Sequence, residues 1–205
     1  MSPRTRYLVF GAVAVLAALA GALIARQTRA PEALPALTAG TRLPAPRALK
    51  PFSLIDQRDA AFTLESLRGA PTLMFFGFTR CPDVCPTTLA LVAAARKAAN
   101  LPTLRVVLVS VDPERDTPAL LASYLAAFDP GFTGLTGPVA DVTALARQLG
   151  VAAARVTLPG GDYTVDHSAA LLWLDADARL AAVFTPPFSI DTLAADLRAL
   201  NGPGT

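Results

Sequence analysis

Two continuous apolar runs of strand length, separated by one Ala- and Leu-rich segment, restrict this chain to a small set of folds. Thr72–Gly77 and Leu104–Val111 are apolar along almost their whole length, which is typical of strands buried within a sheet. Between them, Pro86–Ala99 has the composition of a helix, and proline is tolerated in its first turn. This order indicates an α/β fold in which helices return the chain between buried strands.

The remaining segments add two predicted hairpins and three predicted helices. Alternating apolar segments around polar turns predict the hairpins Phe52–Ile55 with Phe62–Leu64 and Ser168–Leu174 with Arg179–Phe184. Capping residues predict helices from Thr117 to about Phe128, from Asp141 to Gly150, and from Ser189 onward. We therefore expect a central mixed sheet with helices on both faces, and Trp173 in its core.

The N-terminal region contains an apolar run long enough to cross a bilayer. From Tyr7 to Ala25, 19 consecutive residues carry no charge. As a helix they would span about 28 Å at 1.5 Å per residue, close to the roughly 30 Å of a hydrocarbon core. We expect residues 1–6 on the cytoplasmic side and residues 7–25 as a transmembrane anchor or uncleaved signal, with a cleaved secretory signal as the alternative.

Residues 26–48 separate this run from the predicted domain. They are rich in proline and poor in large apolar side chains, which is typical of an extended linker. The folded domain is then expected at residues 49–205, a length that accommodates one hydrophobic core. The sequence therefore predicts one exported domain held away from the membrane.

The charge distribution makes nucleic acid an unexpected partner. Residues 1–30 hold four of the 18 basic residues and no acid, so the rest of the chain carries 14 basic against 16 acidic side chains. No cluster of Lys and Arg interleaved with aromatic residues follows residue 30. A slightly acidic domain would repel a phosphate backbone.

Cys81 and Cys85 are the chain's two cysteines, and they lie between the strand Thr72–Gly77 and the helix predicted from Pro86. In a helical turn, the i, i+4 spacing places both sulfurs on one face, where they could bind one metal ion or form a disulfide. A helix N-terminus is also expected to lower the thiol pKa. A strand, a Cys-x-x-x-Cys loop and a helix together suggest a thioredoxin-like arrangement. A structural disulfide or two buried thiols is the alternative.

His167 is the one histidine of the chain and lies directly before an apolar strand. A lone histidine at a strand end is more often a surface residue than a ligand. Asp166 beside it could orient the imidazole or be a solvated turn residue. Together, two thiolates and one imidazole would make a three-coordinate set that suits Cu(I) and can also hold Cu(II). A closed zinc site or an iron–sulfur cluster would need ligands that the chain lacks.

Four motifs of the chain resemble those of the Sco/SenC copper chaperones. They follow that family's order over roughly residues 50–200: Phe75–Thr88, Val109–Pro118, Phe128–Gly137 and Tyr163–Ser168. The resemblance implies a thioredoxin-like fold and copper bound by Cys81, Cys85 and His167. It also implies a role in building the binuclear copper site of cytochrome c oxidase, and it favours His167 as a ligand over a surface residue.

The function implied by this resemblance is that of a metallochaperone and not of an enzyme. Such a protein would take copper from an upstream donor and pass it to the apo copper-site subunit of cytochrome c oxidase. The alternative is a membrane-tethered thiol-disulfide oxidoreductase, in which Cys81 and Cys85 reduce the cysteines of the copper acceptor. A thiol reductant is expected as a further partner. With the apolar N-terminal run, the resemblance predicts a single-pass protein of the bacterial inner membrane whose domain faces the periplasm.

Arg80 and the acidic segment that contains Asp112 and Asp116 lie near these motifs, and each can be interpreted without a catalytic role. Arg80 precedes Cys81 and could favour its thiolate electrostatically, or could be a solvated loop residue. Asp112 and Asp116 lie in a short acidic segment that could be a catalytic carboxylate cluster. We expect instead a loop before a helix cap, with acidic side chains in the first turn, where the helix dipole stabilises them.

Overall fold

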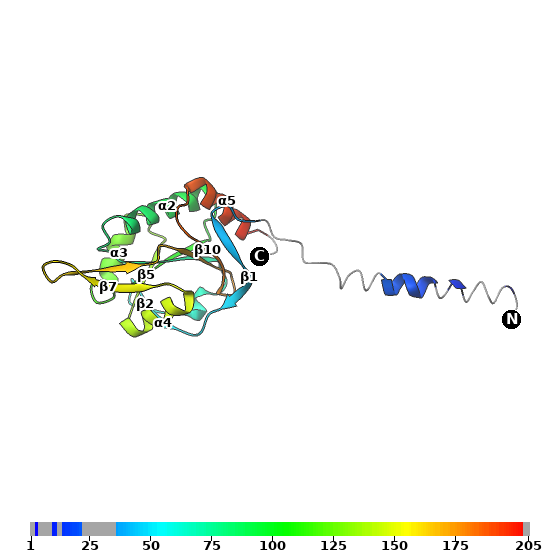
Figure 1. Ribbon diagram of the computed structural model, residues 1–205, viewed down its shortest axis with the longest axis horizontal. Coiled ribbons are helices and arrows are strands. Elements are labelled where there is room, and N and C mark those ends of the chain that lie inside the picture. The colour runs from blue at the N-terminus through cyan, green and yellow to red at the C-terminus, as the bar shows by residue number, and fades with distance from the viewer. Residues whose placement is uncertain (1–2, 4–9, 12–13, 22–35, 203–205) are drawn as a thin grey trace. The chain divides into compact units, whose positions relative to one another are not determined.

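The computed structural model describes residues 3, 10–11, 14–21 and 36–202 (Figure 1). Contacts divide the chain into two compact units, residues 1–35 and 36–205. Among the described residues, no helix is both long and apolar enough to cross a membrane. Most of the predicted cytoplasmic segment, nine residues of the predicted anchor and the first part of the predicted linker lie outside the described residues.

Eight strands of the second unit form one mixed sheet in the order β1-β10-β9-β4-β5-β6-β2-β3 (Figure 1). In sequence order they are β1 Gly40–Ala48, β2 Ser53–Asp56, β3 Ala61–Thr63, β4 Thr72–Gly77, β5 Arg105–Ser110, β6 Thr133–Thr136, β9 Leu171–Leu174 and β10 Arg179–Phe184. The central strand β4 pairs in parallel with β5 and antiparallel with β9. Strands β7 (Ala153–Thr157) and β8 (Tyr163–His167) form a separate antiparallel pair.

Helices cover both faces of the sheet, because the central strands bury side chains on both sides. The helices are η1 Leu64–Leu67, α2 Val84–Ala99, α3 Pro118–Ala126, α4 Val139–Leu149 and α5 Ile190–Leu200. Along β4, Leu73 and Phe75 pack with α2, α3 and α5, whereas Met74 and Phe76 pack with α4 (Figure 1). Trp173 of β9 is fully buried. The predicted thioredoxin-like α/β fold with a mixed central sheet is therefore confirmed.

Most of the predicted helix caps are present. Thr117 accepts a hydrogen bond from the Leu120 N–H, and Ser189 accepts one from the Thr192 N–H. Gly150 ends α4 with a φ of 76°, a conformation that glycine adopts without steric cost. The prediction of Asp141 as a cap is wrong, because Pro138 holds the cap position and Asp141 lies in the first turn. There its carboxylate still lies beside the positive end of the helix dipole.

The predicted linker is also wrong over its last residues. Residues 40–48 form β1, which pairs with β10 at the edge of the sheet. Pro44 and Pro46 fit there because the register shifts between Arg42 and Arg47, and an edge strand tolerates residues without a backbone donor. Proline content therefore did not mark a linker in this segment.

Asp196 of α5 binds the backbone of residues 38–40, where β1 begins. Its carboxylate is 3% exposed and accepts hydrogen bonds from the backbone N–H groups of Thr38, Ala39 and Gly40 at 2.7–3.0 Å. We expect Asp196→Ala to lower the free energy of unfolding by about 3 kcal/mol, because buried donors lose a charged acceptor. Urea denaturation measures this loss. Asp191→Ala, which alters an exposed carboxylate of the same helix, should cost less than about 1 kcal/mol, and equal losses would contradict the assignment.

Candidate metal centre

The two cysteines lie at the carboxyl end of β4, where the chain passes into α2. Helix α2 begins two residues before the predicted Pro86, so Cys85 lies in its first turn and Cys81 in the preceding loop. The Cys85 N–H donates a hydrogen bond to the Cys81 Sγ at 3.4 Å. A side chain at Gly77 would approach Cys85 Sγ to 3.1 Å and Phe75 to 2.9 Å, so glycine allows this close packing. Both cysteines are free thiols in this structure.

His167 reaches the cysteines from the β7–β8 hairpin. It is the last residue of β8, and its Nε2 lies 3.5 Å from the Cys85 Sγ. The two sulfurs and the imidazole nitrogen all lie within 4.8 Å of one another. The structure therefore brings together the three residues that the sequence analysis selected, Cys81, Cys85 and His167, which we call the Cys–Cys–His cluster. Such a cluster could hold one metal ion.

A backbone carbonyl orients the imidazole, so of the two roles left open for Asp166 the structure favours that of a solvated residue. The His167 Nδ1 lies 3.1 Å from the Ser168 carbonyl oxygen, which can only accept a hydrogen bond. Asp166 is exposed, because neighbouring side chains of a strand point to opposite faces. With the proton on Nδ1, Nε2 of the neutral ring carries the free lone pair toward Cys85.

Burial controls the protonation of this cluster. Burial raises the pKa of the Cys85 thiol, and the hydrogen bond with Cys81 raises it further. The expected lowering of the thiol pKa by the helix N-terminus is therefore wrong for Cys85, whose side chain is fully buried. Burial also lowers the pKa of His167 below its ordinary 6.5, although the Ser168 carbonyl and Asp166 act in the opposite direction. Near pH 7 the metal-free cluster thus presents a neutral imidazole and a protonated Cys85.

Aromatic side chains form one wall of the cluster. The rings of Phe75 and Phe78 meet the His167 ring edge to face, with centroids 6.2 and 5.8 Å apart. These contacts restrict the ring and exclude water from its inner side. Arg80 is exposed, in agreement with a solvated loop residue.

The segment 112–116 is a loop before the cap Thr117, as predicted, but its acidic side chains do not lie in the first turn of a helix. Asp112 and Asp116 are buried, and α3 begins only at Pro118 with no acidic residue in its first turn. The acids bind hydrogen-bond donors of neighbouring segments. No pattern in the sequence indicated these contacts, because the partners are distant along the chain.

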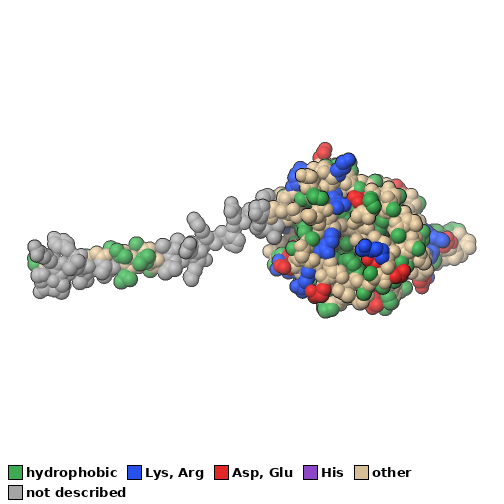
Figure 2. Space-filling model, turned by 180° about the vertical axis from the view of Figure 1, so that it is seen from behind, with side chains coloured by type: hydrophobic (Ala, Val, Ile, Leu, Met, Phe, Trp, Pro, Cys, Tyr) green, Lys and Arg blue, Asp and Glu red, His purple; other side chains and the backbone are tan. Residues whose placement is uncertain are grey.

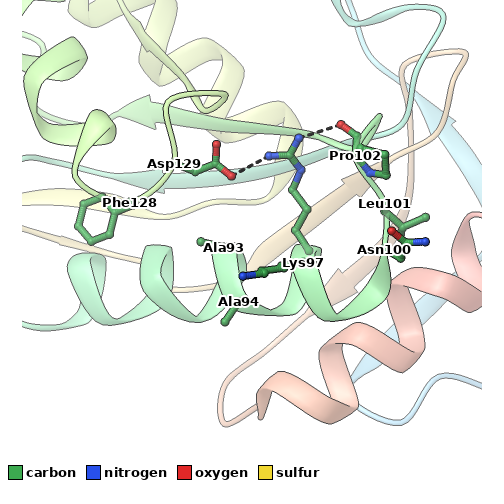
Figure 3. A pocket seen from close by; sticks show the side chains of 9 residues that line it. Ala93, Ala94, Lys97, Asn100, Leu101, Pro102, Phe128 and Asp129 are labelled. Atoms are coloured by element: carbon green, nitrogen blue, oxygen red, sulfur yellow. Dashed lines mark hydrogen bonds and ion pairs between the residues drawn. The ribbon is translucent and has the colours of Figure 1, made fainter.

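A cleft among the described residues lies away from the cluster. It has a volume of about 490 Å³ and is lined by residues of α2, the loop after α2 and the loop after α3. Figure 3 shows Asp129 and the Pro102 carbonyl bound to one guanidinium group, that of Arg96. That arginine is occupied as a cross-link between segments, and no residue of the Cys–Cys–His cluster lines the cleft.

Charges are mixed on the face of the molecule drawn in Figure 2. Basic and acidic side chains alternate there with apolar ones, and the drawn part of the domain shows no continuous basic stripe. This pattern agrees with the small excess of acid after residue 30.

Comparison with known proteins identifies the family. The family model described as SCO1/SenC matches residues 41–202. The chain belongs to the SCO1/SenC family. The resemblance found from the sequence motifs is thereby confirmed, and the matched region includes all of β1 except Gly40 as well as the Cys–Cys–His cluster.

Individual members of the SCO1/SenC family match most of this chain. A protein of Stutzerimonas stutzeri whose name describes it as copper-binding is 40% identical over 156 residues, 74% of this chain and 76% of that protein. The mitochondrial SCO2 homolog of Mus musculus is 36% identical over 157 residues, 72% of this chain but 60% of that protein.

Two solved structures of copper-bound members have the same fold. Bradyrhizobium japonicum ScoI with copper bound is 41% identical, with a TM-score of 0.68 over 74% of this chain and 98% of that one. Arabidopsis thaliana ScoI with copper bound is 32% identical, with a TM-score of 0.70 over 73% of this chain and 94% of that one.

Proposed function

We propose that this protein binds copper at the Cys–Cys–His cluster and delivers it to the binuclear copper site of cytochrome c oxidase during assembly. The observation that carries the proposal is the convergence of two sulfurs and one imidazole nitrogen within 4.8 Å. Thiolates favour Cu(I), and three ligands of this kind satisfy it without a fourth protein ligand. The copper-bound structures of similar proteins support the same metal.

The different exposure of the two cysteines suits a protein that must release its cargo. Cys85 is fully buried beside His167, whereas Cys81 is partly exposed in the loop. A cysteine of the acceptor can therefore approach copper from the Cys81 side and replace its thiolate first. Transfer would proceed by stepwise ligand exchange and needs no covalent change in the acceptor, so this function is not enzymatic.

A thiol-disulfide oxidoreductase is the second candidate function. Cys81 is the sulfur that a disulfide of a partner could reach, and Cys85 lies close enough to complete the exchange with a small rotation. In that reaction two thiols give up two protons and two electrons, and the disulfide of the acceptor takes up both. The oxidised pair would then require an external thiol reductant.

The proposed location is the outer face of a bacterial inner membrane. The apolar run at residues 7–25 supports a single-pass anchor that leaves the domain in the periplasm, near an upstream copper donor and the oxidase subunit. Fractionation tests the anchor: the full-length chain should remain with membranes through high-salt and carbonate washes. A soluble chain that starts near residue 30 would indicate a cleaved signal instead.

Titration of the reduced full-length protein with Cu(I), in competition with a chelator of known affinity, tests copper binding. We expect one copper ion per chain, and loss of this site in Cys81→Ser/Cys85→Ser. Incubation of the loaded protein with the apo copper-site subunit should then move copper to that subunit. Absence of binding by the wild-type protein, or binding retained without the cysteines, would refute the proposed site.

Copper affinity should rise with pH. Burial raises the pKa of Cys85 above its ordinary 9.0, so the metal must displace a proton from this thiol throughout the neutral range. His167 contributes no proton above pH 7, because burial lowers its pKa below 6.5. We therefore expect at least about a tenfold gain in apparent affinity per pH unit between pH 7 and 9. A chelator competition corrected for the chelator's own protonation measures this slope, and a flat profile would contradict it.

A further inference from the structure

Residues 112–116 connect β5 to α3 and contain two of the most buried carboxylates of the domain. Asp112 is 1% exposed and Asp116 is 0% exposed. Carboxylates are rarely buried this completely unless donors satisfy them, because removing the charge from water costs several kcal/mol. Each carboxylate binds a donor from one of the two segments that supply the Cys–Cys–His cluster, Asp116 from Thr79 and Asp112 from Tyr163.

Asp116 binds the segment that leads into the cysteine loop. It accepts hydrogen bonds from the Thr79 hydroxyl at 2.6 Å and the Thr79 N–H at 3.1 Å. The Ser110 hydroxyl donates a further hydrogen bond to the same carboxylate at 2.6 Å. Thr79 stands two residues before Cys81, so this carboxylate fixes where the cysteine loop starts.

Asp112 and Arg115 bind the strand that carries the histidine. The Tyr163 hydroxyl donates to Asp112 Oδ1 at 2.8 Å, and Arg115 donates both to Asp112 and, at 3.0 Å, to the Tyr163 carbonyl. The guanidinium groups of Arg115 and Arg155 also lie over the Tyr163 ring, at 3.7 and 3.9 Å from its centroid. Tyr163 begins β8, and His167 ends it.

The β7–β8 hairpin has few other polar links to the domain. It forms its own two-stranded sheet and makes no ladder with the eight-stranded sheet. Apart from the contacts of the His167 ring with Cys85 and with the adjacent Ser168, the polar contacts that join it to other described residues all end at residues 112–115. Val165 adds apolar packing against the core.

We propose that residues 112–116 act as a bracket that positions both halves of the Cys–Cys–His cluster, the cysteines through Thr79 and the histidine through Tyr163. This inference rests on the proposed copper site. A metal site requires its ligands to be held within about 0.5 Å of their bonding geometry. The two halves lie on elements 82 residues apart, and this one short loop binds both. Asp116, Asp112 and Arg115 are positioning residues, because none of them belongs to the ligand cluster.

If residues 112–116 act as this bracket, a single substitution in them should disturb either the histidine or the cysteines of the cluster, but not both. Arg115→Gln should loosen the histidine half, because glutamine cannot pair with Asp112 and reach the Tyr163 carbonyl as arginine does. Asp116→Asn should loosen the cysteine half, because an amide offers one acceptor oxygen to three donors. Loss of a hydrogen-bond partner that orients a metal ligand typically lowers metal affinity by about 10- to 100-fold.

Two matched controls separate positioning from general destabilisation. Arg96→Gln removes a similar cross-link: Arg96 pairs with Asp129 and donates to a backbone carbonyl, and its side chain is 18% exposed against 14% for Arg115. Asp175→Asn alters another buried carboxylate that accepts three hydrogen bonds, one from Asp177 and two from Arg179. Neither residue contacts the Cys–Cys–His cluster.

The test loads each full-length variant with Cu(II) and records two spectroscopic signatures. Electron paramagnetic resonance reports the nitrogen hyperfine coupling of the imidazole, and absorption reports thiolate-to-copper charge transfer. We expect Arg115→Gln to lose or weaken the nitrogen coupling while the charge-transfer band persists, and Asp116→Asn to change the band while the coupling persists. Both controls should match the wild type. Equal spectra in all variants, or both signatures falling together in step with stability, would overturn the bracket.

Measurements on the metal-free protein keep the inference testable if a variant folds poorly or if the wild type binds no copper. Tyr163→Phe removes one hydroxyl, keeps the ring between its arginines, and should shift the nuclear magnetic resonance signals of the His167 ring. Asp116→Asn should change the alkylation rate of Cys81, because the loop that carries this thiol loses its anchor at Thr79. Unchanged ring signals and unchanged alkylation would overturn the bracket. Absence of copper in the wild type alone would refute the proposed function and leave these two results to decide the bracket.

Discussion

Oxidation of Cys81 and Cys85 to a disulfide is expected to abolish copper binding. The bond consumes both thiolates, as two thiols lose two protons and two electrons to the oxidant, and it leaves only the His167 imidazole as a ligand. One imidazole cannot hold copper against the ligands available elsewhere. The affinity should therefore fall by far more than the roughly 100-fold that loss of a ligand's hydrogen-bond partner can cause.

A copper titration of the reduced and the oxidised full-length protein measures this effect. Cys81→Ser/Cys85→Ser is the control, because weak binding in that variant should not depend on the redox state. In an oxidising compartment the protein would then require a reductant before each loading. Equal copper affinity in both redox states would exclude a redox switch at this pair.

His167→Ala is expected to abolish copper retention while the cysteines remain able to exchange disulfides. The substitution removes the one nitrogen ligand, and two thiolates alone leave a site that a chelator can compete for. Disulfide exchange needs only the two sulfurs, and Cys81 remains partly exposed. The variant should therefore separate the two candidate functions.

Copper content after dialysis against a chelator and the rate of exchange with a small disulfide are the two measurements for this variant. Asp166→Ala is the matched control. It alters the residue next to His167 in β8, but the side chain of Asp166 is exposed. It should retain copper. Loss of exchange in His167→Ala would mean that the histidine also serves the thiol chemistry, and retention of copper would remove it from the ligand set.

The sequence determined the parts of the fold whose signals are local. Strands β4 and β5 could be predicted because a strand buried on both faces is apolar over its central residues, as 73–76 and 106–109 are. The caps Thr117 and Ser189 depend on donors three residues away, so they too were visible. Strands β1, β6, β7 and β8 were not predicted, and β1 and β7 are mostly exposed and lack an apolar pattern.

The candidate metal site also has a part that local sequence predicted and a part that it did not. The spacing of Cys81 and Cys85 is local, and it sufficed to predict that both sulfurs face one ligand. His167 lies 82 residues from Cys85, and only the family resemblance of its motif favoured it as a ligand before the tertiary structure placed it there.

Only the tertiary structure determined the pKa shift of Cys85 and the hydrogen bonds that position the site. The helix N-terminus suggested a lowered thiol pKa, but burial by distant residues raises the pKa of Cys85. Asp112 and Asp116 resembled residues at a helix start, but their donors, Tyr163 and Thr79, lie 51 and 37 residues away along the chain. A charge in a protein responds to all groups within a few ångströms, and sequence proximity identifies only a minority of those groups.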